Sequence, residues 1–222
     1  MKLRLASFNM HFHDGYVVLP QLIQQHAIDL VCLQECRLSK LEPDLMGLQL
    51  LATGKYEFQT LAIYAKPSYS VARIEQIDLP QSIQQRIKRE ERDRLLVVEL
   101  LDTVTQTPLV IANIHAVHLV ALNSHRRKQI AYALQRLNTF AAGLPVMIAG
   151  DLNHPFGKSL LTHTFNRYRF TTAHNTTPTI RNKAIAGIFD YIAYGSTVRS
   201  APLQVVMTPL SDHALIYSDL TF

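Results

Sequence analysis

The segment IAGDLN, residues 148–153, places a carboxylate and an amide two positions apart directly after an apolar run. Side chains at positions i and i+2 of an extended chain point the same way, so Asp151 and Asn153 are expected to face one spot. Asp, Asn and Gly also favour turns, and a turn that only redirects the chain is the alternative interpretation. The rest of the sequence has to distinguish a turn from a chemical site.

The same pattern recurs in five other apolar segments, at their ends or within them. The polar residues at those places are Asn9, Gln34, Glu35, Asn113, His115, Asp190, Asp212 and His213. Removing so many polar groups from water is costly unless they satisfy one another or bind a metal. One such residue would indicate only a turn or a local hydrogen bond, whereas six segments together indicate a shared site.

These residue types fit one kind of chemistry. Asp and Glu oxygens suit a hard cation such as Mg²⁺, which binds one or two carboxylates, water and substrate phosphate oxygens. Histidine, aspartate and asparagine supply a group that activates water, donors to the phosphate charge, and an acid for the leaving oxygen. The set therefore predicts metal-dependent hydrolysis of a phosphodiester.

Charge is distributed unevenly along the chain. The net charge is +5, yet between residues 103 and 189 Asp151 is the one acid. The basic residues of this segment are Arg126, Arg127, Lys128, Arg136, Lys158, Arg167, Arg169, Arg181 and Lys183. A basic segment around an isolated carboxylate indicates a polyanionic ligand, and nucleic acid is the partner we expect. A merely solvated basic surface is the alternative.

The elements that must position these residues are mainly strands. Strands are predicted at 3–10, 30–33, 95–101, 109–115, 146–149, 189–194, 203–207 and 214–220, and a strand pair at 58–65 and 69–77, turned at 66–68. Helices are predicted at 21–27, opened by Pro20, and from Ser124 to about Ala142, ended by Gly143. Residues 84–94 are expected to form an exposed loop or short helix, and 154–188 to be irregular. This order predicts an α/β or α+β fold, with a two-layer β core and helices outside.

Length and composition define the class of protein. With 222 residues, of which 48% are hydrophobic, the chain fits one globular domain spanning residues 1–222. No signal peptide is recognised after Met1, and no apolar run approaches the roughly 20 residues that span a bilayer. Cys32 and Cys36 are too few for a disulfide framework and are expected to be reduced. We therefore expect a cytoplasmic protein, with a monomer favoured.

The ordered motifs of the chain resemble those of the endonuclease/exonuclease/phosphatase superfamily, which has the deoxyribonuclease I-like fold. They are SFNM (7–10), LVCLQE (30–35), NIH (113–115), GDLN (150–153), FDYI (189–192) and SDH (211–213). They cover nearly the whole chain, and their order is more specific than any single motif. The resemblance implies a four-layer sandwich of two packed mixed β-sheets flanked by helices, with a divalent-metal site at one edge.

The resemblance also implies roles for the acidic and amide residues. Glu35 would be the main ligand of Mg²⁺, or of Mn²⁺, with Asn9 beside it and Asp212 assisting. Asp151 would orient or deprotonate the attacking water. Asn153 would donate a hydrogen bond to a phosphate oxygen.

The histidines and one arginine complete the implied site. His213 would contact the phosphate as a cation, with Asp190 behind it to orient the ring and raise its pKa. His115 matches the branch of the family with His in this motif, where it is a candidate general acid or phosphate contact. Arg126 and Gln129 match an Arg-x-x-Gln pattern in which the Arg is either structural or faces the substrate.

The leading hypothesis is a Mg²⁺-dependent phosphodiesterase, a nuclease that hydrolyses DNA or RNA. Its expected substrate contacts are Arg126, Lys158, Arg167, Arg169 and Arg181. One alternative is a phosphatase or phosphodiesterase for a phospholipid headgroup or a small phosphorylated metabolite. A second is a non-catalytic binding module on the same fold. Residues 60–65 lack the Gly and Ser that the family usually carries in this strand, which affects expected substrate contacts rather than the metal site.

Overall fold

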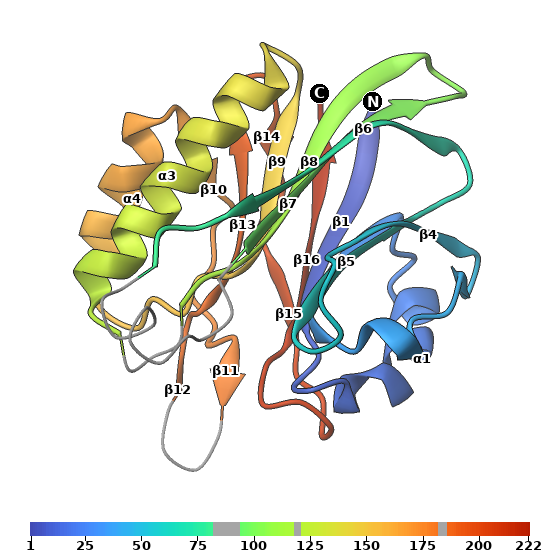
Figure 1. Cartoon of the computed structure of the whole chain (residues 1–222), viewed down its shortest axis with the longest axis horizontal. Helices are drawn as coiled ribbons and strands as arrows, with labels where there is room; N and C mark the ends of the chain where they lie inside the picture. The colour runs from blue at the N-terminus through green and yellow to red at the C-terminus, as the bar shows by residue number, and fades with distance from the viewer. Residues whose placement is uncertain (82–93, 118–120, 182–185) are drawn as a thin grey trace.

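Two β-sheets pack face to face in the computed structural model, which describes residues 1–81, 94–117, 121–181 and 186–222 (Figure 1). The first sheet has, in spatial order, β14 (Arg199–Ser200), β16 (Leu215–Thr221), β1 (Lys2–Asn9), β2 (Leu30–Cys36), β5 (Thr60–Ala65), β4 (Leu48–Thr53) and β3 (Asp44–Leu45). An eighth strand, β15 (Gln204–Val206), also pairs with β16. β1 and β2 are parallel whereas β1 and β16 are antiparallel, so this sheet is mixed.

The second sheet has six strands. Their spatial order is β10 (Phe170–Thr172), β13 (Asp190–Gly195), β9 (Val146–Asp151), β8 (Thr107–His115), β7 (Arg94–Asp102) and β6 (Tyr69–Asp78). β8 and β9 are parallel and their other neighbours are antiparallel, so this sheet is mixed as well. A separate two-stranded sheet joins β11 (Ile180–Arg181) to β12 (Ala186–Gly187).

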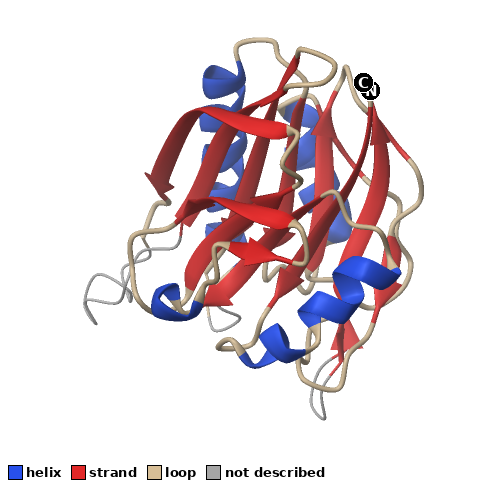
Figure 2. Cartoon of the chain, turned by 90° about the vertical axis from the view of Figure 1, so that its right-hand side faces the viewer, coloured by secondary structure: helices blue, strands red, loops and turns tan. Residues whose placement is uncertain are grey.

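Helices cover the outer face of each sheet (Figures 1 and 2). α1 (Leu19–Gln25) packs its apolar side on the first sheet, while α3 (Asn123–Ala141) and α4 (Lys158–Arg167) pack on the second. A third apolar cluster fills the space between the sheets. Short 3-10 helices η1 (Asp14–Val17) and η2 (Leu38–Lys40) follow β1 and β2. The order helix, sheet, sheet, helix confirms the expected four-layer sandwich.

Most of the expected elements are present. The strands expected at 95–101 and 109–115 form a hairpin, β7 with β8, which pairs from Arg94 with His115 to Asp102 with Thr107. α3 ends where the chain turns through left-handed conformations at Ala142 and Gly143. Ser124 is not its cap, because Leu122 holds the N-cap position. The segment expected at 84–94 lies outside the described residues apart from its last residue, which begins β7. No helix in the described ranges is long and apolar enough to cross a membrane.

The expectation that residues 58–65 and 69–77 pair with each other as strands is wrong. β5 pairs with β2 and β4 in the first sheet, whereas β6 pairs with β7 in the second. Residues 66–68 therefore cross between the sheets instead of reversing the chain within one. All of β5 is buried, as in a strand covered on both faces, whereas β6 is an edge strand and is largely exposed. The two strands therefore differ in burial as well as in sheet.

The expectation that residues 154–188 are irregular is also wrong, because this segment contains α4, β10, β11 and β12. α4 begins after Gly157, whose φ of +78° is a conformation that glycine adopts easily. It buries Leu161 and Phe165, four positions apart on one face. α4 buries no other residue, so the sequence offers one apolar pair at helical spacing and no longer repeat.

A buried hydrogen-bond network joins the two sheets close to the edge where β2 and β8 end. Nε2 of Gln34 donates to Oδ1 of Asn113 at 2.8 Å, and Nδ2 of Asn113 donates to the backbone oxygens of Leu33 (2.8 Å) and Ala62 (3.0 Å). Both side chains are fully buried. These bonds fix the position of β8 in one sheet relative to β2 and β5 in the other.

Candidate active site

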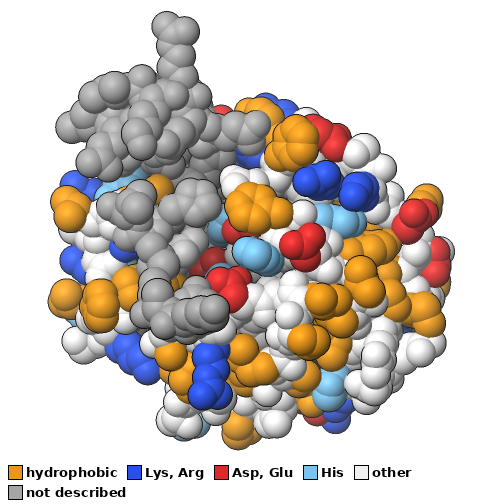
Figure 3. Space-filling model, turned by 90° about the horizontal axis from the view of Figure 1, so that it is seen from below, with side chains coloured by type: hydrophobic (Ala, Val, Ile, Leu, Met, Phe, Trp, Pro, Cys, Tyr) orange, Lys and Arg blue, Asp and Glu red, His pale blue; other side chains and the backbone are white. Residues whose placement is uncertain are grey.

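Strand ends from both sheets converge at one edge of the sandwich. The residues there are Asn9 at the end of β1, Glu35 near the end of β2, His115 and Asp151 at the ends of β8 and β9, Asp190 at the start of β13, and His213 just before β16. Three of them are side by side in the second sheet, because Asp151 is in register with both His115 and Asp190. The face seen in Figure 3 shows acidic and histidine side chains gathered near its centre.

The carboxylate of Asp151 is the centre of this cluster. Its Oδ2 accepts a hydrogen bond from Nδ2 of Asn9 at 3.1 Å, and lies 3.8 Å from Nε2 of His115 and 3.7 Å from Nε2 of His213. The residue is 1% exposed. Burial raises the pKa of the Asp151 carboxyl above its usual range, although the neighbouring His213 opposes the shift. A carboxylate with a raised pKa is a better base toward water.

Glu35 shares two of these neighbours. Its Oε1 accepts from Nδ2 of Asn9 at 3.3 Å and lies 3.7 Å from Nε2 of His115, while its Oε2 accepts the backbone N–H of Phe12 at 3.2 Å. Glu35 has a φ of +55°, and the pairing of β2 with β5 shifts register around it. Such a bulge redirects a side chain at the end of a strand. The carboxylates of Glu35 and Asp151 therefore lie on either side of one amide nitrogen.

His213 is held between two carboxylates. Its Nδ1 lies 3.0 and 3.1 Å from the carboxylate oxygens of Asp190, and its Nε2 faces Asp151. Burial alone would lower the pKa of His213, but the charges of Asp190 and Asp151 outweigh burial and raise it to about 10. His213 is thus an imidazolium at neutral pH, with Asp190 fixing its ring.

Asp151 and Asn153 lie together, although not for the expected reason. β9 ends at Asp151, and Asn153 has a left-handed φ of +48°, so the segment is not extended. The backbone N–H of Asn153 donates to Oδ1 of Asp151 at 2.7 Å, and its Nδ2 donates to the backbone oxygen of Ala116 at 3.1 Å. The segment is a turn and part of the polar cluster at the same time.

Gly150 explains why this turn can form beside β8. A Cβ atom at Gly150 would lie 1.9 Å from the backbone oxygen of Ile114, closer than any real contact, and the φ of Gly150 is +149°. Only glycine allows β9 to approach β8 this closely. The pairing can therefore continue to the last residues of both strands, where His115 is opposite Asp151.

The oxygen-rich part of the cluster fits a hard divalent cation. The carboxylates of Glu35 and Asp151 both lie within 3.3 Å of the amide nitrogen of Asn9, and both are buried. Two buried like charges at this spacing repel each other, and a bound cation would offset the repulsion. Asp151, Asp190 and His213 also offer ligand atoms within 4.8 Å of one another. The carboxylate oxygens of this set suit a hard divalent cation, whereas an imidazolium at His213 offers no lone pair to a metal.

Arg126, which the sequence offers as a substrate contact, holds backbone beside the site. Its side chain is buried, and its Nε donates to the backbone oxygen of Val117 at 3.2 Å. Oε1 of Gln129 accepts the backbone N–H of the same Val117 at 3.0 Å. The two side chains thus hold the chain just after His115, which is the structural alternative of the Arg-x-x-Gln pattern.

Arg167 and Arg169 also lie away from the cluster. They flank the end of α4 and precede β10, whose Phe170 pairs with Gly195. Gly195 is at the opposite end of β13 from Asp190, and a strand of this length spans about 17 Å. The two arginines therefore lie at the far end of the second sheet, one strand length from Asp190.

Two other expected contacts lie closer to the site. Arg181 lines a cleft together with Asp212, and its backbone N–H donates to the backbone oxygen of Asp212 at 2.9 Å. Lys158 begins α4, which follows the Asp151 turn, and it lines a smaller hollow with Tyr191. Lys183 lies outside the described residues.

Thr179 supports the site and was missed in the sequence. Its hydroxyl oxygen accepts the backbone N–H groups of Phe189 (2.9 Å) and Asp190 (3.0 Å), which fixes the start of β13. Thr179 lies in a stretch rich in Thr and Pro that reads as an ordinary loop, so no sequence signal marked it. Asn113 and Gln34 were marked by their positions near strand ends, but their role as a clamp between sheets required the structure.

Comparison with known proteins agrees with the fold. An endonuclease/exonuclease/phosphatase family protein from Bacteroides thetaiotaomicron superimposes with a TM-score of 0.82 at 15% identity, over 100% of this chain and 98% of the other. A mannosyl-6-phosphatase from the same organism gives 0.79 at 15%, over 99% and 100%. TDP2 from D. rerio, complexed with a single-strand DNA product, gives 0.78 at 17%, over 100% and 99%. At these identities the similarity concerns the fold.

The sequence itself carries the family assignment. No relative was found among the curated proteins compared. The profile of the endonuclease/exonuclease/phosphatase family, however, matches residues 6–213, which include every strand end of the cluster. This chain therefore belongs to the endonuclease/exonuclease/phosphatase family.

Proposed function

We propose that this chain is a Mg²⁺-dependent phosphodiesterase whose substrates are nucleic acids or nucleotides. The observation that carries the proposal is the position of the Asp151 carboxylate. It is buried, its pKa is raised, and its Oδ2 lies between the amide of Asn9 and the imidazoles of His115 and His213. A carboxylate that served only a turn would not need these neighbours.

Asp151 would act on the attacking water. A general base has to lie within hydrogen-bond reach of the proton it accepts, and it works best when its pKa approaches the working pH. The backbone N–H of Asn153 holds Oδ1 of Asp151 at 2.7 Å, which leaves Oδ2 directed toward Asn9 and the two histidines. This arrangement supports water activation at Oδ2.

His213 would stabilise the phosphate charge. Its Nδ1 is bound by Asp190 and its Nε2 is directed toward Asp151, so the ring presents a fixed positive charge beside the base. His115, whose Nε2 faces both Asp151 and Glu35, is the second imidazole within reach of the reacting groups. Preorganised donors of this kind lower the barrier because they need no reorganisation during the reaction.

Glu35 and Asn9 would hold the metal, with Asp212 assisting. Bound Mg²⁺ would neutralise charge on the phosphate and position it. Both side chains are oriented by backbone donors. The N–H of Phe12 donates to Oε2 of Glu35, and the N–H of His11 donates to Oδ1 of Asn9 at 3.0 Å. A non-catalytic module would have no use for a buried base, a fixed imidazolium and two adjacent carboxylates.

A second candidate is hydrolysis of a small phosphorylated metabolite or a phospholipid headgroup. It is favoured by the position of Arg167 and Arg169 at the far end of the second sheet, because a basic track along the site would support a long nucleic-acid ligand more strongly. The mannosyl-6-phosphatase among the structures of this fold illustrates such a substrate class.

The test is a substrate panel with purified protein. It should include plasmid, linear and single-stranded DNA, RNA, sphingomyelin, a chromogenic phosphodiester and a sugar phosphate, each with Mg²⁺, Mn²⁺ or EDTA. Metal-dependent cleavage of DNA or RNA that is lost in the Asp151→Asn variant supports the proposal. Cleavage of the sugar phosphate or lipid alone would favour the second candidate, and no metal-dependent cleavage of any substrate would refute both.

A further inference from the structure

A cleft of about 1050 Å³ lies beside the candidate site, where Ser211 and Asp212 directly precede His213. At the site end it is lined by Ser211, Asp212 and Arg181, and beyond them by residues of the chain between β1 and α1. The volume is at the upper end of the ~300–1,000 Å³ range of small-molecule pockets, and far exceeds the size of one phosphate group. A ligand whose phosphate lies near Asp212 therefore has room to place its remaining part in this cleft.

The wall beyond the site is a strained turn. His11, Phe12 and His13 have φ values of +45°, +56° and +83°, three successive left-handed residues without a glycine. Such conformations cost free energy and persist where the surroundings impose them. Here the backbone N–H groups of His11 and Phe12 are bound by the side chains of Asn9 and Glu35, so the turn is built onto the site itself.

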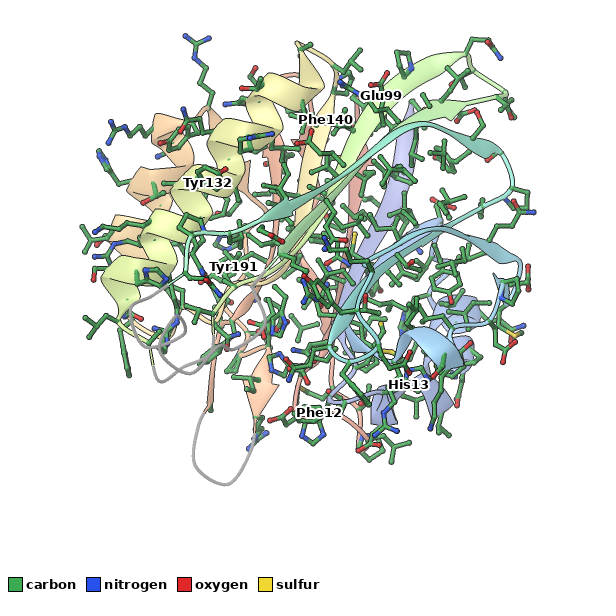
Figure 4. The ribbon with its side chains drawn as sticks, in the orientation of Figure 1. Phe12, His13, Glu99, Tyr132, Phe140 and Tyr191 are labelled. Atoms are coloured by element: carbon green, nitrogen blue, oxygen red, sulfur yellow. The ribbon has the colours of Figure 1, made fainter. Side chains whose placement is uncertain are left out.

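The turn presents aromatic rings to the cleft. His13 and Tyr16 both line it, and their rings are stacked, with centroids 4.7 Å apart and planes 14° from parallel. Burial lowers the pKa of His13, and nearby Lys40 and Arg37 lower it further, so its ring is neutral at pH 7. Phe12, 52% exposed, packs edge-on against His11, which also lines the cleft. Figure 4 shows Phe12 and His13 at the same end of the molecule.

The rest of the cleft is partly apolar and carries charges of both signs, with acids in the majority. Val17 and Leu210 line it and are 76% and 39% exposed. The two bases Lys40 and Arg181 are accompanied by the three acids Asp14, Glu42 and Asp212. A polyphosphate would be repelled by these acids, whereas a flat, uncharged ring with polar edges would find both apolar faces and hydrogen-bonding partners.

We propose that this cleft binds the base of a nucleotide, stacked against the His13–Tyr16 pair, while the phosphate of that nucleotide lies at Asp212 and His213. The proposal rests on the proposed function, and it assigns specificity to the turn of residues 11–13 rather than to the basic segment. Stacking tolerates every base, because each has an aromatic face. The site therefore selects nucleotides over sugar phosphates without reading a sequence.

Equilibrium binding tests the proposal without requiring turnover. Calorimetry with Mg²⁺ present should compare adenosine 5′-monophosphate with ribose 5-phosphate, which keeps the sugar and phosphate and lacks the base. One stacked base should make the nucleotide bind about tenfold tighter. His13→Asn removes the ring but tolerates a left-handed backbone, so it should bring the ratio close to one. His13→Tyr restores a ring and should keep the preference.

A matched control is His163→Asn on the exposed side of α4, which should leave the ratio unchanged. Equal affinity of the wild-type protein for the two ligands would overturn the proposal, as would an unchanged preference in His13→Asn. Tighter binding of mannose 6-phosphate than of the nucleotide would also overturn it and indicate a sugar site. A nucleotide preference in a protein that hydrolyses no phosphodiester would refute the proposed function and leave the base site standing.

Discussion

Nε2 of His213 lies 3.7 Å from Oδ2 of Asp151, where Asp151 ends β9 in the second sheet and His213 directly precedes the first sheet's β16. The proximity affects both groups. The carboxylate helps to raise the pKa of His213 to about 10, and the imidazolium opposes the rise in the pKa of Asp151 that burial causes. The pair therefore places a carboxylate with a raised pKa beside a fixed cation, an arrangement suited to attack of water on a phosphate.

Asp151→Asn should reduce hydrolysis by about 10²–10⁴-fold, the usual contribution of a general base. Substrate binding should survive or improve, because the substitution removes a negative charge near the phosphate. Steady-state kinetics with separate kcat and KM values, combined with binding to the inactive variant, measures both effects. Near-normal kcat would show that Asp151 only shapes the turn.

Asn153→Ala is the companion change. The substitution removes the hydrogen bond from Nδ2 to the backbone oxygen of Ala116, and it replaces a residue type that tolerates the φ of +48°. It keeps the backbone N–H that donates to Asp151. It should therefore lower kcat less than Asp151→Asn does. An equal or larger loss in kcat would mean that the amide has a greater part in the reaction than the carboxylate.

Metal dependence provides a second prediction. Mg²⁺ or Mn²⁺ should support hydrolysis and EDTA should abolish it, because Glu35 and Asp151 form a buried carboxylate pair that a cation would stabilise. Glu35→Gln should raise the Mg²⁺ concentration for half-maximal rate and lower kcat. Glu99→Gln is the control, since Glu99 pairs with Arg73 in β6 and lies at the other end of the molecule from Phe12 (Figure 4). Full activity in EDTA would exclude the assignment.

The convergence of polar side chains at one sheet edge was predictable, because a buried strand has few places for a polar side chain other than its ends. A carboxylate at the end of a fully apolar segment has to emerge at a sheet edge, and the parallel pairs β1–β2 and β8–β9 bring their ends to the same edge. The order of motifs then indicated the fold. Element types also followed from apolar spacing, as for α3 and the β7–β8 hairpin.

Long-range placement was not predictable in the same way. Charge counted along the chain put Arg126, Arg167 and Arg169 in one basic segment, yet the fold buries the first and carries the others to the far end of a sheet. The pairing of β5 and β6 with different sheets likewise depends on which partner strand completes each hydrogen-bond ladder. Such choices are made by tertiary packing, and a local pattern does not contain them.

Salt dependence should separate the basic residues that matter from those that do not. A plot of the logarithm of the binding constant against the logarithm of salt concentration has a negative slope, and each lost phosphate contact makes that slope shallower by about one. Arg181→Gln should weaken binding of single-stranded DNA and reduce the slope by about that amount, because Arg181 lines the cleft beside Asp212. The double variant Arg167→Gln with Arg169→Gln removes more charge, but its two sites lie at the far end of β13. It should change neither the affinity for single-stranded DNA nor the salt slope. A larger effect from the double variant would restore the basic segment as the binding surface.

The clamp between the sheets predicts a stability effect. Asn113→Ala removes one acceptor and one amide that donates to two carbonyls, and leaves the fully buried Gln34 without this partner. We expect the free energy of unfolding to fall by about 3 kcal/mol. Asn138→Ala, which removes an exposed bond to the backbone oxygen of Tyr168, should cost less than about 1 kcal/mol. Urea unfolding of both variants measures the difference, and equal losses would contradict the clamp.

The last prediction concerns pH and the stability of the metal-free protein. The pKa of His213 is about 10 in the folded chain and close to its ordinary value of 6.5 in the unfolded chain. Below pH 6.5 both states hold the proton, so the stabilisation by Asp190 and Asp151 is fully present. Between 6.5 and 10 only the folded state keeps it, so stability falls as pH rises, by about 1.4 kcal/mol per pH unit at most. Urea unfolding in EDTA at pH 6 and pH 9 should show this fall, and His213→Gln should remove much of it, whereas the exposed His163→Gln should not. An identical pH dependence in wild type and His213→Gln would mean that His213 is neutral in the folded protein, and the fixed cation beside Asp151 would have to be abandoned.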